Sequence, residues 1–167
     1  SDQRIQLPLL NEFQNAAEEF GIPKTKDFNT GNNHGCGYFQ VTEKDGFRCS
    51  TAVGYLNPIK HRTNLKIITK AHVKKINFEN KTTKSVEYWQ ENELKKVIVN
   101  KEVILSSGSI GSPQILQTSG IGNSDKLRNL GIDMVHDLKG VGENLQDHLM
   151  FRPIYKIQGL KSLNKKI

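Results

Sequence analysis

The most constraining feature of the sequence is a short apolar run that leads into a turn of small residues. The run Val-Ile-Leu at 103–105 comes directly before residues 106–112, which are Ser and Gly with a single Ile. A buried strand followed by such a turn and then by a helix is typical of α/β proteins. The Ser-Pro pair predicts a helix that begins at Pro113, and Gly120 predicts where that helix ends.

The small residues of this turn allow two explanations. A ligand could approach the backbone N–H groups closely, and the start of the following helix favours an anion or the polar edge of a ring. Close packing of a strand against a helix explains the same residues, and the pattern alone leaves both explanations open. The turn is not a phosphate-binding P-loop, because no Gly-Lys-Ser/Thr follows it, and it does not match G-x-G-x-x-G.

A meander of antiparallel strands is predicted before the apolar run. Segments rich in β-branched and other apolar residues alternate with the tight turns Glu79-Asn80-Lys81 and Glu91-Asn92. The predicted strands cover residues 65–69, 72–78, 85–90 and 94–100. We expect this meander and the strand 103–105 to fold as one unit.

The other segments predict short helices and strands. Residues 8–20 place apolar side chains on one helical face, and Gly21 predicts the end of that helix. Residues 27–37 form a polar loop, and Asp45-Gly46 is typical of a hairpin turn. Further helices are expected over 50–56 and 124–130, the latter capped by Ser124, and further strands over 38–42, 134–136 and 150–157.

Composition and charge exclude several classes of protein. Of the 167 residues, 35% are hydrophobic, and no apolar run approaches the roughly 18 residues of a membrane helix. The net charge is +7, but the lysines are scattered, so nucleic-acid binding is not predicted. The first residues are polar, so we expect no signal peptide and a protein that is cytoplasmic or peripheral at the inner membrane.

No side-chain pattern identifies a metal site or an activated nucleophile. The five histidines form no H-x₃-H or H-E-x-x-H pair, so no metal is expected. Ser119 lacks the G-x-S-x-G elbow of serine hydrolases. Cys36 and Cys49 could pair across a hairpin, but two cysteines are too few for a disulfide scaffold, and reduced structural thiols are the simpler expectation.

One stretch carries a resemblance to a known family. Residues 108–122 contain a pair of small residues, Ser-Pro, two aliphatic residues and Ser-Gly-Ile-Gly. This order resembles the second signature of the glucose–methanol–choline (GMC) oxidoreductases. Further stretches resemble the same family in the expected order, so that the resemblance covers residues 8–157 and is greatest to the choline dehydrogenase and bacterial alcohol dehydrogenase branch. These stretches are 37–42, 46–52, 71–73 and 140–148.

The resemblance implies a mixed α/β fold, in which a Rossmann-like FAD-binding domain carries an inserted antiparallel β-meander. Residues 1–149 would be an incomplete FAD-binding domain that lacks the N-terminal βαβ unit with its G-x-G-x-x-G motif. Residues 150–167 would begin the substrate domain. Strand edges left open by the missing unit predict self-association of the chain.

The resemblance also implies site residues. Val73 resembles the position whose backbone contacts the adenine of FAD. Ser106, Ser107 and Gly108 resemble the turn that passes close to the adenosine half of FAD. The catalytic His of the family would lie beyond residue 167, so we expect no catalytic residue in this chain, and we assign none to His148.

The resemblance therefore predicts a segment of an FAD-dependent enzyme that oxidises the CH–OH group of a small alcohol, with choline-like substrates included. We expect the isolated segment to be inactive. The alternative is a non-catalytic binding or assembly module that retains the GMC scaffold. The sequence leaves open which alcohol is oxidised and whether the enzyme is a dehydrogenase or an oxidase.

Overall fold

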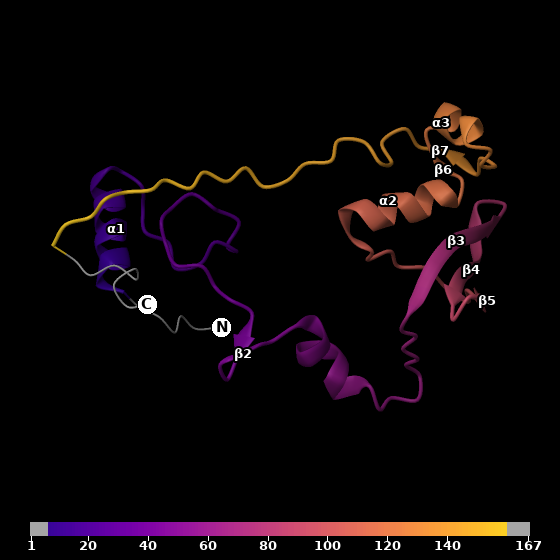
Figure 1. Ribbon diagram of the computed structural model, residues 1–167, viewed down its shortest axis with the longest axis horizontal. Helices are drawn as coiled ribbons and strands as arrows, with labels where there is room; N and C mark the ends of the chain where they lie inside the picture. The colour runs from indigo at the N-terminus through magenta and orange to yellow at the C-terminus, as the bar shows by residue number, and fades with distance from the viewer. Residues whose placement is uncertain (1–6, 160–167) are drawn as a thin grey trace. The chain divides into compact units, whose positions relative to one another are not determined.

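The computed structural model describes residues 7–159, which belong to two compact units. One unit contains the chain up to Lys66 together with the segment from Phe151 onward, and the other contains Ile67–Met150. Figure 1 follows the chain through both units by colour. Each unit is described by itself.

The first unit contains one regular helix and several short elements. Helix α1 covers Pro8–Glu19, with Pro8 in its first turn, and Gly21 follows at a φ of +96°, as the sequence predicts. The polar loop is closed by backbone hydrogen bonds, in which the Thr25 N–H donates to the Cys36 carbonyl at 2.9 Å and the Cys36 N–H donates to the Pro23 carbonyl at 2.8 Å. Cys36 and Cys49 are free thiols.

The hairpin turn predicted at Asp45-Gly46 is confirmed. Strands β1 (Glu43–Lys44) and β2 (Phe47–Arg48) pair antiparallel around Asp45-Gly46, whose φ angles of 53° and 84° are both positive. Two consecutive positive φ angles match the twist of a two-residue hairpin turn. The strand predicted over 38–42 is wrong, because these residues form no strand and β1 begins at Glu43.

The helix predicted over 50–56 is a π-helix, η1 (Ala52–Leu56), continued by a 3₁₀ turn, η2 (Asn57–Ile59). The Ser50 hydroxyl accepts a hydrogen bond from the Val53 N–H at 3.3 Å, so Ser50 supports the start of this segment. The strands predicted over 65–69 and 150–157 are also wrong, since these extended residues join no described sheet.

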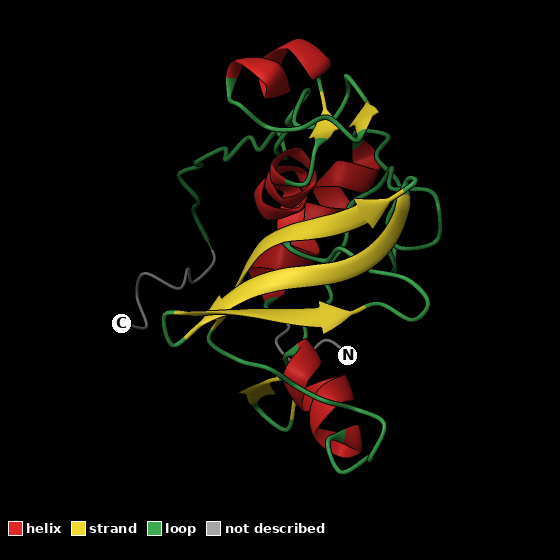
Figure 2. Ribbon diagram, turned by 90° about the vertical axis from the view of Figure 1, so that its right-hand side faces the viewer, coloured by secondary structure: helices red, strands yellow, loops and turns green. Residues whose placement is uncertain are grey.

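The second unit is built on the predicted meander. Strands β3 (Ala71–Glu79), β4 (Thr82–Gln90) and β5 (Glu93–Ile98) form an antiparallel sheet in that order (Figure 2). Both hairpin turns, Asn80-Lys81 and Glu91-Asn92, have positive φ angles between 49° and 65°. Non-glycine residues enter this region at some cost, and Asn does so most readily.

The run 103–105 is not the buried strand that the sequence predicts. Ile104 is 77% exposed, and no described strand pairs with this segment. Strand propensity reflects the side chains, whereas a strand requires a neighbour to accept and donate its backbone hydrogen bonds. The apolar run therefore lies beside β5 in sequence without entering the sheet.

Two helices follow this run. Helix α2 (Gly108–Thr118) begins five residues before the predicted Pro113, which lies inside it, and α2 packs against β3. Strands β6 (Ile121–Gly122) and β7 (His136–Asp137) pair in parallel, and helix α3 (Ser124–Asn129) lies between them in sequence. The side chain of Asn123 caps α3 by accepting the N–H groups of Asp125 and Lys126, so the predicted cap at Ser124 is wrong by one residue.

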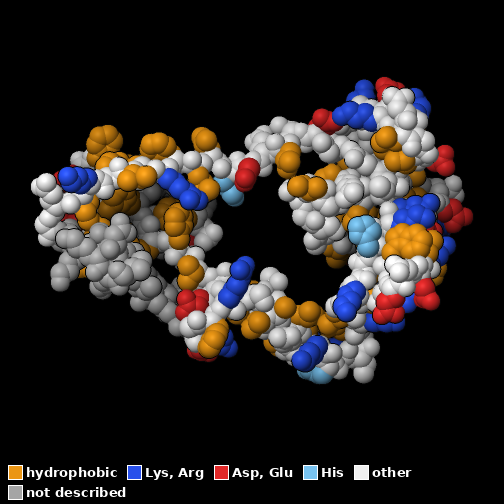
Figure 3. Space-filling view, in the orientation of Figure 1, with side chains coloured by type: hydrophobic (Ala, Val, Ile, Leu, Met, Phe, Trp, Pro, Cys, Tyr) orange, Lys and Arg blue, Asp and Glu red, His pale blue; other side chains and the backbone are white. Residues whose placement is uncertain are grey.

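The buried core of the described residues is small. Ile76 and Leu127 are 4% and 2% exposed, and the hydroxyl residues Ser85 and Ser119 are buried with them. On the face shown in Figure 3, Lys and Arg occur in several separate places with Asp and Glu among them. Within residues 7–159, no helix is long and apolar enough to cross a membrane.

The mixed α/β fold with an antiparallel meander, which the sequence predicts, is confirmed in this structure.

Candidate cofactor site

A hollow of about 370 Å³ lies between the beginning of β3 and helix α2. Residues 71–74 of β3 and Trp89 of β4 form one side of it. The other side is formed by Ser107 and by the α2 residues Gly111, Gln114, Ile115 and Thr118. Its volume lies within the range of small-molecule sites, which are commonly about 300 to 1,000 Å³.

The turn at residues 106–108 is shaped by its small residues. Gly108 has a φ of +80°, in the region that favours glycine, and no other atom lies within 4 Å of the place where a Cβ would stand. Glycine is therefore needed there for its backbone angle. At Gly111 the reason differs, because a Cβ would lie 3.0 Å from the Ser107 Cβ, so the turn can approach the helix only where a side chain is absent.

Ser112 supports this turn but does not begin the helix. Its hydroxyl oxygen accepts a hydrogen bond from the Ser107 N–H at 3.1 Å. The Ser-Pro pair predicts a helix start, but here Ser112 stabilises the turn that precedes α2. Pro113 lies inside α2 and has no N–H to donate there.

The strand side of the hollow contains a β-bulge. The pairing of β3 with β4 passes from Val73 opposite Tyr88 to Lys75 opposite Glu87, so Lys74 is the extra residue. The Lys74 ammonium lies 3.9 Å from the Glu87 carboxylate and 5.9 Å from the centre of the Trp89 ring. A cation and an indole ring thus stand together at the wall of the hollow.

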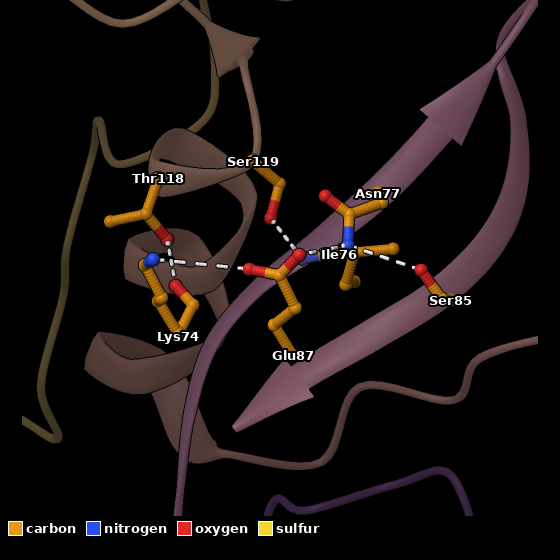
Figure 4. Close-up of polar contacts among 7 residues, drawn as sticks. All are labelled: Lys74, Ile76, Asn77, Ser85, Glu87, Thr118 and Ser119. Carbon is orange, nitrogen blue, oxygen red and sulfur yellow. Dashed lines mark hydrogen bonds and ion pairs between the residues drawn. The ribbon is translucent and has the colours of Figure 1, made fainter. Parts of the chain in front are cut away.

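Polar contacts attach the end of α2 to the bulged strand, as Figure 4 shows. The Ile76 N–H donates to the Ser119 Oγ at 2.8 Å, and the Thr118 hydroxyl lies 3.1 Å from the Lys74 carbonyl oxygen. On the sheet itself, the Asn77 side-chain amide donates to the Ser85 Oγ at 3.1 Å and to Glu87 at 2.9 Å. Helix and sheet are therefore fixed to each other within a few residues of Val73.

The residues predicted from sequence meet in part. Val73 and Ser107 line the same hollow, while Ser106 and Gly108 adjoin Ser107 in the turn without lining it. The sequence did not predict three other parts of the lining: Lys74, Trp89 and the α2 residues. Trp89 reaches the hollow through the pairing register, which places it opposite His72. Gln114 and its neighbours reach it only through the packing of α2 on β3. The regular spacing of the predicted strands is the one sequence signal that could have suggested Trp89.

A second hollow of about 670 Å³ lies on another side of α2. It is lined by α2 residues and by residues 142–146, within the last stretch that resembles the GMC family. The Gln117 side-chain amide donates to the Val141 carbonyl at 3.1 Å, and the space beside it is kept free by Gly142, whose Cβ would collide with that amide. Gln117 therefore holds residues 141–142 beside the helix.

His148 is exposed, and its backbone N–H donates to the Asp147 carboxylate at 2.7 Å. Residues 7–159 contain no group of three or more His, Cys, Asp or Glu side chains that could hold a metal ion.

Comparison with solved structures relates this architecture to flavoenzymes. An FAD-dependent oxidoreductase from Chaetomium thermophilum is similar to 86% of this chain with a TM-score of 0.77 and 34% identity, over 25% of its own length. A fungal aryl-alcohol oxidase is similar to 87% of this chain with a TM-score of 0.69 and 32% identity, over 24% of its length.

Comparison of sequences gives the same relationship. The oxygen-dependent choline dehydrogenase of Chromohalobacter salexigens is 48% identical over 85% of this chain and 26% of its own length. The alcohol dehydrogenase [acceptor] of Pseudomonas putida is 43% identical over 89% of this chain and 27% of its length. The chain therefore spans about a quarter of the length of the curated relatives it matches.

The family model described as GMC oxidoreductase matches residues 2–150. FAD is the cofactor of the related flavoenzymes, and the chain belongs to the GMC oxidoreductase family.

Proposed function

We propose that this chain is the adenosine-binding middle segment of an FAD-dependent oxidoreductase that acts on the CH–OH group of a small alcohol. The observation that carries the proposal is that Val73 and Ser107, which come from distant parts of the sequence, line one hollow. The resemblance to the GMC family associates each of these two residues separately with the adenosine end of FAD. Their meeting in space is an independent geometric support for that match.

The residues present fit this group. The hollow offers the backbone of residues 71–74. The turn before α2 takes its shape from the positive φ of Gly108 and from the close approach that Gly111 allows. Flat, polar heterocycles are commonly recognised by backbone groups that approach closely in this way. When bound, FAD supplies the hydride acceptor, and the residues of this chain contribute binding and orientation.

The curated relatives suggest the substrate class. Their names include choline dehydrogenase and alcohol dehydrogenase, so we infer that the complete protein oxidises a small alcohol, choline among the candidates. Residues 1–149 would form part of its FAD-binding domain, and residues 150–167 would begin its substrate domain.

Binding of ADP tests the assigned site directly, since ADP carries the adenosine half of FAD. In a titration of the ¹⁵N-labelled chain, we expect the amide resonances of Val73 and Ser107 to shift with a Kd of about 1 mM, as suits a small ligand held by few contacts. We expect GDP, which has a different ring edge, to produce smaller shifts. A titration in which ADP leaves both resonances unmoved would contradict the proposed site.

A pair of glycine variants sharpens this test. Gly111→Val places side-chain atoms against Ser107 and should weaken ADP binding by roughly tenfold or more, because the turn must move. Gly140→Val is the matched control, since nothing lies within 4 Å of its Cβ position. Equal ADP affinity of the two variants would count against the assigned hollow.

The activity of the chain itself is a separate question. We expect no turnover when the purified chain is mixed with FAD, an alcohol and an artificial electron acceptor. Rapid reduction of the acceptor would show that the segment alone is a complete enzyme and would refute this part of the proposal.

The alternative is a binding or assembly module that retains the GMC scaffold without catalysis. A flavin absorption band in the full-length protein that contains this chain supports the oxidoreductase. Its absence, together with ADP binding at the hollow, favours the module.

A further inference from the structure

We propose that Ser119 is a positioning residue for the adenosine site: its hydroxyl holds the bulged edge of β3 against α2, and so fixes Val73 relative to Ser107. This inference rests on the proposed function, because it concerns how the same hollow is kept in shape. It assigns Ser119 no contact with the ligand.

The hydrogen bonds of Ser119 give its hydroxyl a defined direction. Ser119 is 6% exposed and directly follows the last residue of α2. Its Oγ donates to the Ile115 carbonyl at 2.5 Å and accepts from the Ile76 N–H at 2.8 Å. A hydroxyl has one proton, and because the helix carbonyl takes it, the oxygen lone pairs are directed toward the strand. The side chain therefore bridges helix and strand with a single atom.

The bridge meets β3 just after its bulge. Lys74 is the extra residue of the bulge, Val73 precedes it and Ile76 follows two residues later. Bulges redirect the side chains and backbone groups next to them, and they persist only where the surroundings hold them. Because β3 is an edge strand of the three-stranded sheet, its outward backbone groups have no strand partner there, and the Ser119 hydroxyl satisfies one of them.

The two walls of the hollow depend on this attachment. Val73 belongs to the strand wall, and Ser107 and Gly111 belong to the wall formed by α2 and its preceding turn. If the C-terminal end of α2 separates from β3, the helix can tilt and the two walls move apart. The Ser119 hydroxyl, next to Thr118 at the C-terminal end of α2, can thereby control the spacing at which the adenosine would be held.

Thr118 has a lesser part in the same attachment. Its hydroxyl lies 3.1 Å from the Lys74 carbonyl, but also 3.0 and 3.1 Å from the Gln114 and Ile115 carbonyls of its own helix. One proton is shared among three acceptors, so the bond to β3 is made only part of the time. Ser119 therefore contributes more than Thr118 to the attachment of α2 to β3.

Ser85 offers a matched control on the same sheet. It is 1% exposed, and its hydroxyl accepts a hydrogen bond from the side-chain amide of Asn77 on the neighbouring strand. Ser85→Ala and Ser119→Ala each remove one buried hydroxyl that accepts a hydrogen bond, so we expect comparable losses of stability. Only Ser119→Ala removes an attachment between helix and strand.

The test combines amide hydrogen exchange with ADP titration of the full ¹⁵N-labelled chain. In Ser119→Ala we expect the Ile76 amide to exchange roughly tenfold faster than in Ser85→Ala, since it has lost its acceptor. We also expect ADP, followed at the Val73 amide, to bind about fivefold to tenfold more weakly to Ser119→Ala. Ser85→Ala should keep its ADP affinity within about twofold of the original chain.

The outcomes separate this inference from the proposed function. If ADP does not bind to the unmodified chain, the proposed site fails, and the inference fails with it. If ADP binds the unmodified chain but Ser119→Ala and Ser85→Ala bind it equally well, the site stands and the positioning role of Ser119 is refuted.

A second pair of variants covers the case in which Ser119→Ala does not fold. Ser119→Cys replaces the hydroxyl with a thiol of similar shape that accepts hydrogen bonds more weakly, and Ser85→Cys is its matched control. We expect Ser119→Cys to weaken ADP binding by about twofold to threefold and Ser85→Cys to leave it unchanged. Indistinguishable binding by these two variants would overturn the proposal.

Discussion

Gly120 provides a sharp test of why the family sequence has Ser-Gly at the end of α2. Gly120 has a φ of +87°, and a Cβ placed on it would collide with the Asp133 carbonyl oxygen and stand 3.0 Å from Val135. Its own carbonyl accepts the Val135 N–H at 2.8 Å and the His136 N–H at 3.1 Å. Glycine is therefore required both for its backbone angle and for the close approach of the β7 segment.

The expected cost of Gly120→Ala can be divided into two parts. An alanine in the left-handed region costs about 1 to 2 kcal/mol. The collision is with backbone, which cannot turn away as a flexible side chain can, and displacing it adds about 1 to 3 kcal/mol. We therefore expect the free energy of unfolding to fall by about 2 to 5 kcal/mol.

Gly131 makes it possible to separate these two parts. Its φ is +68°, but nothing lies within 4 Å of its Cβ position, so Gly131→Ala should show only the cost of the backbone angle. The difference between the two variants then measures the collision with the segment at Asp133–Val135.

Urea unfolding followed by tryptophan fluorescence is the appropriate assay. The chain has one Trp, and because it lies in β4, the signal reports on the second unit alone. Equal losses of stability for Gly120→Ala and Gly131→Ala would refute the reasoning, since they would show that the space at Gly120 is not restricted.

Three further predictions use the same unit. Leu127→Ala should lower the free energy of unfolding by about 2 to 4 kcal/mol, measured by urea midpoint, because Leu127 is 2% exposed; a loss below about 1 kcal/mol would contradict its place in the core. Asn123→Ala should cost about 1 kcal/mol through loss of the α3 cap, whereas Ser124→Ala should cost less than about 0.5 kcal/mol. Sedimentation velocity should show concentration-dependent self-association through the β5 edge, which exposes Val97 and Ile98; a strictly monomeric profile over a wide concentration range would count against it.

The part of the fold that could be predicted from sequence is the part specified locally. The meander β3–β5 follows from alternating apolar residues and from turn residues such as Asn80 and Asn92, and these signals require no knowledge of distant segments. The glycines at 21, 120 and 131 end helices as predicted, since each takes a positive φ.

The part that could not be predicted depends on partners distant in sequence. Four segments have the composition of strands but form no strand in the described structure: residues 38–42, 65–69, 103–105 and 150–157. Apolar composition cannot say whether a neighbouring strand is present to complete the hydrogen bonds. The start of α2 was missed for a local reason, because the same Ser-Pro pair that commonly begins a helix here supports the turn before it.

In the candidate site, too, local patterns predict some features and contacts between distant residues decide the others. Val73 was identified only by family resemblance, whereas the turn at 106–108 was indicated by its small residues and then by the resemblance. Their joint location follows from the packing of α2 on β3. In the sequence, Ser119 is part of the stretch that resembles the GMC signature, and it lacks the surroundings of a nucleophile. Its structural role depends on a hydrogen bond to a residue 43 positions earlier, which no local pattern encodes.

That separation of 43 positions also constrains the order in which the second unit can form. The hairpins of the meander close over two-residue turns, whereas the bond between Ile76 and Ser119 must wait until the whole intervening chain has been made. Loop closure over short distances is faster than over long ones. We therefore expect the sheet to form first with an uncovered β3 edge, which the hydrogen bond to Ser119 covers once α2 has been made.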